Sequence, residues 1–155
     1  MKSYEVIIIG GSYSGLSAAL ALGRSLRKVL VIDGGKPCNR FTPHSQNFLT
    51  HDGRKPAEIS AIAKEQVLQY KTVEFLEDVA LNAEKTEQGF TVETDRGTFQ
   101  SKRLILAAGL RDILPDIPGI AECWGKSVIH CPYCHGYEFH SQKTGILAND
   151  EKAFH

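Results

Sequence analysis

The chain has 155 residues, of which 42% are apolar and 23% charged, as in an ordinary globular domain with its own core. Its 18 basic and 18 acidic residues cancel, so charge gives no reason to expect nucleic acid or an anionic membrane as a partner. Residues 1–5 lead into a short apolar run without the hydrophobic region of a signal peptide, and no stretch approaches the roughly 20 apolar residues of a membrane span. We therefore expect a cytoplasmic protein that binds neither nucleic acid nor a membrane.

The N-terminal residues follow the pattern of a strand, a helix and a second strand. Residues 4–9 are a β-branched run that ends at glycines, as a buried parallel strand does. Small and apolar residues then recur at helical spacing over 16–26, and residues 29–32 form a second buried run that stops at Asp33. A unit of about thirty residues with this order predicts a doubly wound α/β fold.

The turn between the first strand and the helix has the composition of a nucleotide-binding loop. It reads Gly10-Gly11-Ser12-Tyr13-Ser14-Gly15, where backbone N–H groups at a helix start can hold a pyrophosphate. Asp33 lies 18 residues after Gly15, near the spacing at which an acid binds the ribose hydroxyls of adenosine. The alternative is a plain connection between strand and helix.

Beyond Asp33 the sequence alternates between a loop, a helix and short strands. Residues 34–55 are rich in Gly, Asn, Pro and His and predict a long loop, a kind of segment that is usually functional. A helix is expected from Pro56 to Tyr70. Short strands are expected at 73–75, 79–83, 90–94, 98–100, 104–109, 127–129 and 144–148. The small residues that end the strand at 104–109 would let a bulky ligand approach the backbone.

Cys131 and Cys134 are separated by two residues, which is the spacing of a redox-active pair. One thiol of such a pair attacks and the other resolves the mixed disulfide, so that a small disulfide ring closes and reopens. Unreactive buried thiols are one alternative. Zinc is another, through the four residues His130, Cys131, Cys134 and His135, although adjacent ligands do not easily converge on one ion. Cys38 and Cys123 are expected to be structural.

The order of these motifs resembles the low-molecular-weight thioredoxin reductases, which are FAD-dependent pyridine nucleotide-disulphide oxidoreductases. The resemblance rests on the turn at 10–15, the acid-ended strand at Asp33, the strand 106–109 and the stretch 131–138, and it is greatest to the dithiol oxidase branch that includes gliotoxin oxidase. It implies FAD on a first Rossmann-like domain of three-layer ββα character and a redox disulfide on a second, nucleotide-binding-like domain. The other redox partner would be a pyridine nucleotide, ferredoxin or oxygen.

Three features depart from the family pattern. Ser12 replaces the middle glycine of the fingerprint, and His135 stands after the second cysteine where familiar members have an aspartate, a position from which a histidine can also transfer a proton. Family members are about twice as long, so we expect this chain to be an N-terminal fragment of a protein that is a homodimer at full length. We place the FAD-binding domain at 1–114 and the start of the second domain at 115–155.

These observations predict a flavin-dependent thiol–disulfide oxidoreductase that acts on a small dithiol or a thioredoxin-like protein. The resemblance assigns Cys134 to the flavin side and Cys131 to the substrate side, with His135 as the third catalytic residue. The expected FAD contacts are Gly10, Ser12, Tyr13, Ser14, Gly15, Asp33, Gly34, Arg40, Asn47, Val79, Ala107 and Gly109. The alternatives are a non-catalytic redox sensor and a flavin oxidoreductase with incidental cysteines.

A second nucleotide fingerprint is missing where the family order would place it. Residues 148–153 read Ala-Asn-Asp-Glu-Lys-Ala, in which side chains and two acids replace the glycines that a pyrophosphate needs. We therefore expect oxygen, rather than NADPH, as the electron partner.

Overall fold

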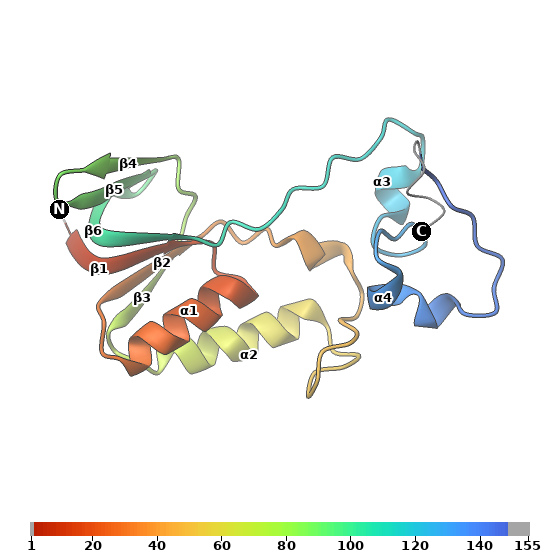
Figure 1. Ribbon diagram of the computed structural model, residues 1–155, viewed down its shortest axis with the longest axis horizontal. Coiled ribbons are helices and arrows are strands. Elements are labelled where there is room, and N and C mark those ends of the chain that lie inside the picture. The colour runs from red at the N-terminus through yellow and green to blue at the C-terminus, as the bar shows by residue number, and fades with distance from the viewer. Residues whose placement is uncertain (1, 149–155) are drawn as a thin grey trace.

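The computed structural model describes residues 2–148 and contains one mixed sheet with two principal helices (Figure 1). The strands are β1 (Lys2–Ile9), β2 (Val29–Asp33), β3 (Val73–Glu77), β4 (Asn82–Thr86), β5 (Gly89–Thr94) and β6 (Gly97–Leu106). The helices are α1 (Tyr13–Arg24), α2 (Pro56–Leu68), α3 (Ile120–Cys123) and α4 (Pro132–His135), with 3-10 turns η1 (Cys38–Phe41) and η2 (Tyr137–Phe139). Within residues 2–148 no helix is long and apolar enough to cross a membrane.

The strand order of the sheet is β3-β2-β1-β6-β5-β4. Strands β3, β2, β1 and β6 run parallel, and β5 and β4 continue the sheet in antiparallel pairing from β6. In the centre, Ile7 is aligned with Leu30 on one side and with Leu104 on the other. The predicted α/β, Rossmann-like fold is therefore confirmed.

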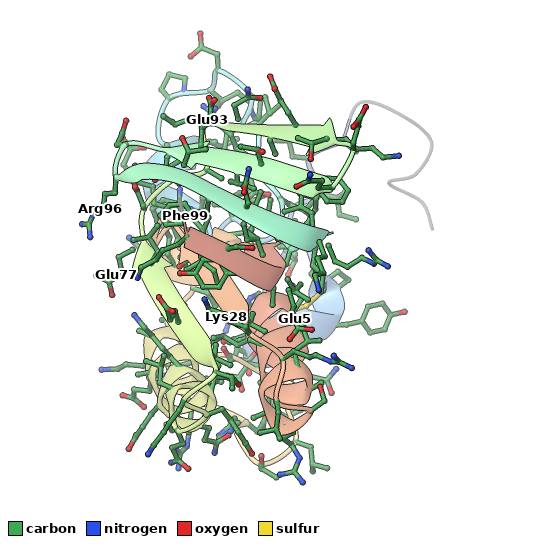
Figure 2. The ribbon with its side chains drawn as sticks, turned by 90° about the vertical axis from the view of Figure 1, so that its left-hand side faces the viewer. Glu5, Lys28, Glu77, Glu93, Arg96 and Phe99 are labelled. Atoms are coloured by element: carbon green, nitrogen blue, oxygen red, sulfur yellow. A yellow bond between two sulfur atoms is a disulfide. The ribbon has the colours of Figure 1, made fainter. Side chains whose placement is uncertain are left out.

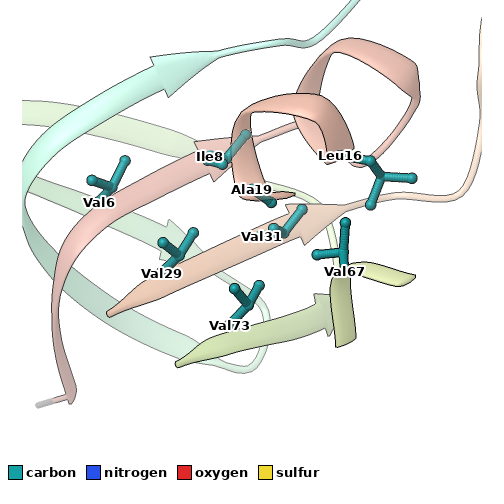
Figure 3. Close-up of a cluster of buried hydrophobic side chains, with 8 residues drawn as sticks. All are labelled: Val6, Ile8, Leu16, Ala19, Val29, Val31, Val67 and Val73. Carbon is teal, nitrogen blue, oxygen red and sulfur yellow. The ribbon is translucent and has the colours of Figure 1, made fainter. Parts of the chain in front are cut away.

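Alternate residues of the central strands supply two separate cores. Ile8 of β1 and Val31 of β2 face the helices, where they pack with Leu16 of α1 and Val67 of α2 (Figure 3). The opposite face buries a second cluster, made of Tyr4, Ile7, Leu30, Ile32 and Val92. Because Val92 belongs to β5, the antiparallel part of the sheet contributes to the core on the face that the helices leave free.

Several predicted strand boundaries were wrong. The expected strands at 98–100 and 104–109 are one continuous strand, β6, which stays paired with β1 from Phe99 to Leu106. Residues 107–109 follow that strand and are not part of it. The strand expected at 79–83 lies at 82–86, because its register is set by pairing with β5 rather than by its own apolar residues.

Helix α1 also differs from its predicted range of 16–26. It begins at Tyr13 and ends at Arg24, and Leu26 beyond it has a left-handed φ of 58° and is exposed. Leu26 therefore ends the helix rather than extending its apolar face.

The segment after β6 runs away from the sheet to α3 and α4 (Figure 1). The strand predicted at 127–129 is only a single bridge between Trp124 and Val128. Residues 144–148, also predicted as a strand, have no strand structure. In both cases the sequence pattern is present, but within residues 2–148 no strand pairs along its length. The predicted boundary between residues 114 and 115 stays a prediction.

Candidate functional site

The glycine-rich turn fits tightly between β1 and α1. Gly10 has a left-handed φ of 103°, and a Cβ atom at this position would collide with the carbonyl oxygen of Ala107. Ala107 in turn donates its N–H to the carbonyl of Ile9 at 2.7 Å. The absence of a side chain at Gly10 thus lets the end of β6 close against the turn, which fixes the position of the first turn of α1.

Asp33, at the end of β2, holds the two glycine-rich segments together. Its Oδ1 accepts a hydrogen bond from the N–H of Gly11 at 3.0 Å, and its Oδ2 accepts one from the N–H of Gly35 at 3.2 Å. A carboxylate has about four acceptor positions, so both oxygens retain capacity for ligand hydroxyls. Asp33 therefore shapes the turn and can still bind a ribose.

A cavity of about 750 Å³ opens where β1, β2 and β3 end. Its size lies within the roughly 300–1,000 Å³ usual for small-molecule sites, and its place at the carboxyl ends of parallel strands is where α/β sheets bind their ligands. It brings together five of the expected cofactor contacts, namely Ser12, Asp33, Gly34, Arg40 and Val79.

The other expected contacts do not line this cavity: Gly10, Tyr13, Ser14, Gly15, Asn47, Ala107 and Gly109. Gly10, Gly15 and Ala107 pack against one another behind the turn. Ser14 is exposed on α1, and Asn47 lies in the long loop with its N–H bonded to Asp52 at 2.7 Å. Their roles as FAD contacts stay predictions.

Sequence reasoning missed the wall that α2 contributes to the cavity. Ala57, Ser60, Ala61 and Lys64 line it from one face of the helix. Their spacing of three and four residues was readable, but the prediction used only the apolar stripe of this helix. Small side chains on a helical face next to a nucleotide-binding turn were the available signal.

Charged side chains surround the end of the cavity near β3. Lys64 Nζ lies 2.7 Å from Glu77 Oε1 and 3.9 Å from the centre of the Phe75 ring. The hydrogen bond and charge of Lys64 lower the pKa of the Glu77 carboxyl, and Arg96 on the same side of the sheet adds to this effect (Figure 2). The cavity thus has an aromatic surface with a cation over it.

Ser12 occupies the fingerprint position that is usually glycine. Its φ of −92° and ψ of −162° are extended and need no glycine. Its side chain lines the cavity and makes no capping hydrogen bond to α1. The serine is therefore compatible with the turn and leaves a hydroxyl for the ligand.

Cys131 and Cys134 form a disulfide at the start of α4, with their Cα atoms 5.3 Å apart. The N–H of Cys134 donates to Sγ of Cys131 at 3.2 Å, so Cys131 caps the short helix. His135 completes this helix and is half-buried. Cys38 is exposed on η1 and Cys123 lies in α3, and neither forms a disulfide within the described residues.

The cysteine pair and the cavity belong to different parts of the chain. All residues that line the cavity lie between Gly11 and Val79, so none comes from the segment that carries the disulfide. Among residues 2–148 no three His, Cys, Asp or Glu side chains are placed to hold a metal ion.

The cavity residues are suited to the FAD that the sequence predicts. Ser12 and the turn beside it offer hydroxyl and N–H donors to a pyrophosphate, and Asp33 offers acceptors to a ribose. At Gly11 a Cβ atom would lie 2.7 Å from the Phe75 ring, so a larger residue would fill the wall of the cavity. The donor and acceptor set thus matches an adenosine diphosphate.

Comparison with known proteins agrees with this geometry. Residues 4–148 match the family of pyridine nucleotide-disulphide oxidoreductases. The chain therefore belongs to this family, and its relatives are thioredoxin reductase-like.

Two fungal relatives and one bacterial structure illustrate the similarity. The chain is 40% identical over 148 residues to the thioredoxin reductase tcpT of Claviceps purpurea, covering 93% of this chain and 46% of tcpT. It is 37% identical over 151 residues to the thioredoxin reductase aclD of Aspergillus oryzae, covering 94% and 48%. An oxidoreductase from Agrobacterium tumefaciens superposes with a TM-score of 0.86 at 50% identity, covering 90% and 48%. The chain spans about half the length of the curated relatives it matches.

Proposed function

We propose that this chain is the flavin-binding and disulfide-bearing part of an FAD-dependent thiol–disulfide oxidoreductase. The observation that carries the proposal is the Cys131–Cys134 disulfide in a chain that also has a dinucleotide-sized cavity at its strand ends. Bound FAD would supply a two-electron acceptor or donor for the pair. The residues that would hold it are Ser12, Asp33, Gly34, Arg40 and Val79.

The cysteine pair can exchange electrons with a dithiol without any other group. A substrate thiolate attacks Sγ of Cys131, the bond to Sγ of Cys134 breaks, and Cys134 leaves as a thiolate. The second substrate thiol, once deprotonated, attacks the substrate sulfur of this mixed disulfide and releases Cys131 as a thiolate. The substrate has then lost two electrons and two protons and formed its disulfide, and the pair is reduced to the dithiol level.

The surroundings of each sulfur support different roles. The N–H of Cys134 donates a hydrogen bond to Sγ of Cys131. This hydrogen bond would stabilise the thiolate that forms on Cys131 when the substrate disulfide leaves. His135, next to Cys134, is placed in sequence to give or take the proton of that thiol. Tyr133 and Tyr137 are exposed beside the pair and offer an aromatic surface to a substrate.

The proposal is tested on the full chain with its bound cofactor. Anaerobic addition of a dithiol should bleach the flavin absorption of the wild type, and admission of air should restore it with formation of peroxide. Cys131→Ser should retain flavin but lose bleaching, while Cys123→Ser, the control, should behave as wild type. Wild-type protein that cannot be loaded with FAD would overturn the proposal.

The same experiment separates the two directions of electron flow. Rapid bleaching by micromolar NADPH would assign a reductase, whereas bleaching by dithiol alone would assign a dithiol oxidase. We propose the oxidase, because residues 148–153 lack the glycines of a second nucleotide turn. Residues 149–153 lie outside the described part of the structure.

A further inference from the structure

The chain's single tryptophan lies a few residues before the cysteine pair and is fixed at both its ring and its backbone. The indole N–H of Trp124 donates to Asp112 Oδ2 at 3.2 Å, which ties the connection after β6 to the end of α3. The backbone of Trp124 forms a bridge with Val128, and next to it the N–H of Gly125 donates to the carbonyl of Val128 at 2.9 Å. Trp124 is therefore a fixed point in a segment with little regular structure.

The fixed indole carries the ring of His130, the residue immediately before Cys131. The ring centres of Trp124 and His130 are 5.6 Å apart and their planes differ by 22°, which is a stacked arrangement. Aromatic pairs at this separation attract each other beyond the effect of the area they bury. Because His130 is an exposed residue, this stack is a principal restraint on its ring.

The environment of the Cys131 sulfur depends on how the chain enters from His130. Cys131 has an extended backbone, with φ −127° and ψ 107°, and its Sγ accepts from the N–H of Cys134 at 3.2 Å. Such a donor stabilises a thiolate only when the sulfur and the N–H are aligned, because hydrogen bonds weaken steeply as they bend. A rotation of the backbone before Cys131 would move its sulfur away from this donor.

Resting on the proposed function, we infer that Trp124 is a positioning residue for the cysteine pair. Through its stack on His130 it fixes the backbone before Cys131, and this keeps the Cys131 sulfur aligned with the N–H of Cys134. The hydrogen bond raises the fraction of Cys131 present as thiolate, the form that attacks a disulfide or leaves from one. His130 takes part through its ring and not through its proton.

The test is the alkylation rate of each cysteine in the flavin-loaded full chain, reduced with dithiothreitol that is then removed, and kept free of oxygen. Iodoacetamide at neutral pH labels thiolates, and tandem mass spectrometry assigns the label to Cys131 or Cys134. Trp124→Ala should lower the rate at Cys131 by a factor of about 2 to 10, the range that follows from the energy of one aromatic pair. The rate at Cys134 should equal that of the wild type, which a general loss of structure would not allow.

Variants of His130 separate the role of the ring from that of the proton. His130→Ala should lower the Cys131 rate as Trp124→Ala does. The double variant should be no slower than either single variant, because both remove the same stack. His130→Phe keeps a ring for stacking and should react as the wild type does. A slow His130→Phe would show that the imidazole acts as a base, and would overturn the inference.

His140→Ala is the matched control. The His140 ring lies 5.1 Å from that of Tyr137, so this is another histidine–aromatic pair, but one that follows the cysteines instead of preceding them. The Cys131 rate in His140→Ala should equal that of the wild type. The FAD affinity of every variant should also be unchanged, because the cavity is lined only by residues between Gly11 and Val79.

Wild-type reactivity of Cys131 in Trp124→Ala would contradict the inference, and so would an equal loss in His140→Ala. If Trp124→Ala does not fold, as judged by its thermal midpoint, His130→Ala, which leaves the indole in place, decides the same question. A wild type that binds no FAD, or whose cysteine pair dithiothreitol cannot reduce, would instead overturn the proposed function, so the two failures are distinct.

Discussion

Tyr4 shows how a single buried side chain near the start of β1 links the core to surface charges. The residue is 2% exposed and packs against Phe99, with ring centres 6.4 Å apart. Its hydroxyl donates to Glu74 Oε2 at 2.9 Å, and Lys2 Nζ lies 3.2 Å from the same oxygen. Burial, together with the hydrogen bond and the charge of Glu74, raises the pKa of Tyr4 to about 12.

The raised pKa of Tyr4 predicts a loss of stability at high pH. In the unfolded chain a tyrosine ionises near pH 10, and in the folded chain it stays protonated until about pH 12. Its contribution is therefore complete below pH 10 and is lost as the pH rises towards 12. The difference in urea unfolding free energy between wild type and Tyr4→Phe should shrink over this window. A difference that is independent of pH would contradict the assignment.

At the scale of elements, Asp78 connects three segments around the cavity. Its backbone N–H donates to the carbonyl of Asp33 at 3.1 Å. Its carboxylate accepts from the N–H of Val79 at 2.9 Å and from the N–H of Arg96 at 3.0 Å. The end of β2, the connection from β3 to β4 and the turn between β5 and β6 thus meet at one side chain.

The charge state of Asp78 should therefore control the shape of the cavity wall at Val79. Hydrogen bonds from the Thr94 hydroxyl and from the N–H groups of Val79 and Arg96 lower the pKa of the Asp78 carboxyl. This stabilisation is present above the ordinary pKa of an aspartate and is lost as the pH falls through the lowered value. Asp78→Ala should remove this stabilisation at neutral pH. It should weaken FAD binding several-fold, measured by fluorescence titration of the flavin-free protein with FAD.

Asp95 supplies the control for this prediction. It lies in the same turn between β5 and β6, and its side chain makes no hydrogen bond within residues 2–148. Asp95→Ala should bind FAD as the wild type does when the flavin-free variant is titrated with FAD and followed by flavin fluorescence. Equal effects of the two substitutions would show that the negative charge of this turn, and not the connections made by Asp78, matters.

At the scale of the molecule, the sheet and the disulfide segment are joined by an extended connection (Figure 1). Residues 107–115 have no regular structure, and Leu110 and Ile113 are 81% and 93% exposed. A second link is the close approach of Gly125 to Phe41 in the long loop, where a Cβ atom would lie 3.2 Å from the Phe41 backbone. The cavity and the cysteine pair are thus carried by parts with few contacts between them.

This arrangement predicts where a protease should cut the folded chain. Brief trypsin treatment should cleave after Arg111, which is exposed and outside any strand. Cleavage after Arg103 should be much slower, because that residue is also exposed but its backbone belongs to β6, beside Val6 of β1. Mass spectrometry of the fragments identifies the site. Equal rates at the two arginines would show that β6 opens as easily as the connection.

The sequence by itself determined the elements whose patterns are local. The β-branched runs of β1 and β2, the glycine turn and the paired cysteines were readable because strand burial, helix starts and a two-residue cysteine spacing depend on neighbouring residues. They were enough to predict the α/β fold, the nucleotide-binding turn and Asp33. The motif order also indicated the family.

Only the tertiary structure decided what depends on residues far apart in the chain. Pairing with β1 joined two expected strands into β6, and residues 144–148 have no strand structure although their pattern predicted one. The α2 wall of the cavity joins that helix to the glycine turn and to the ends of β2 and β3. The contact between Tyr13 and Asn39 joins residues 26 positions apart. A pattern within one segment records its own burial and conformation, but a binding site is made by side chains that only folding brings together.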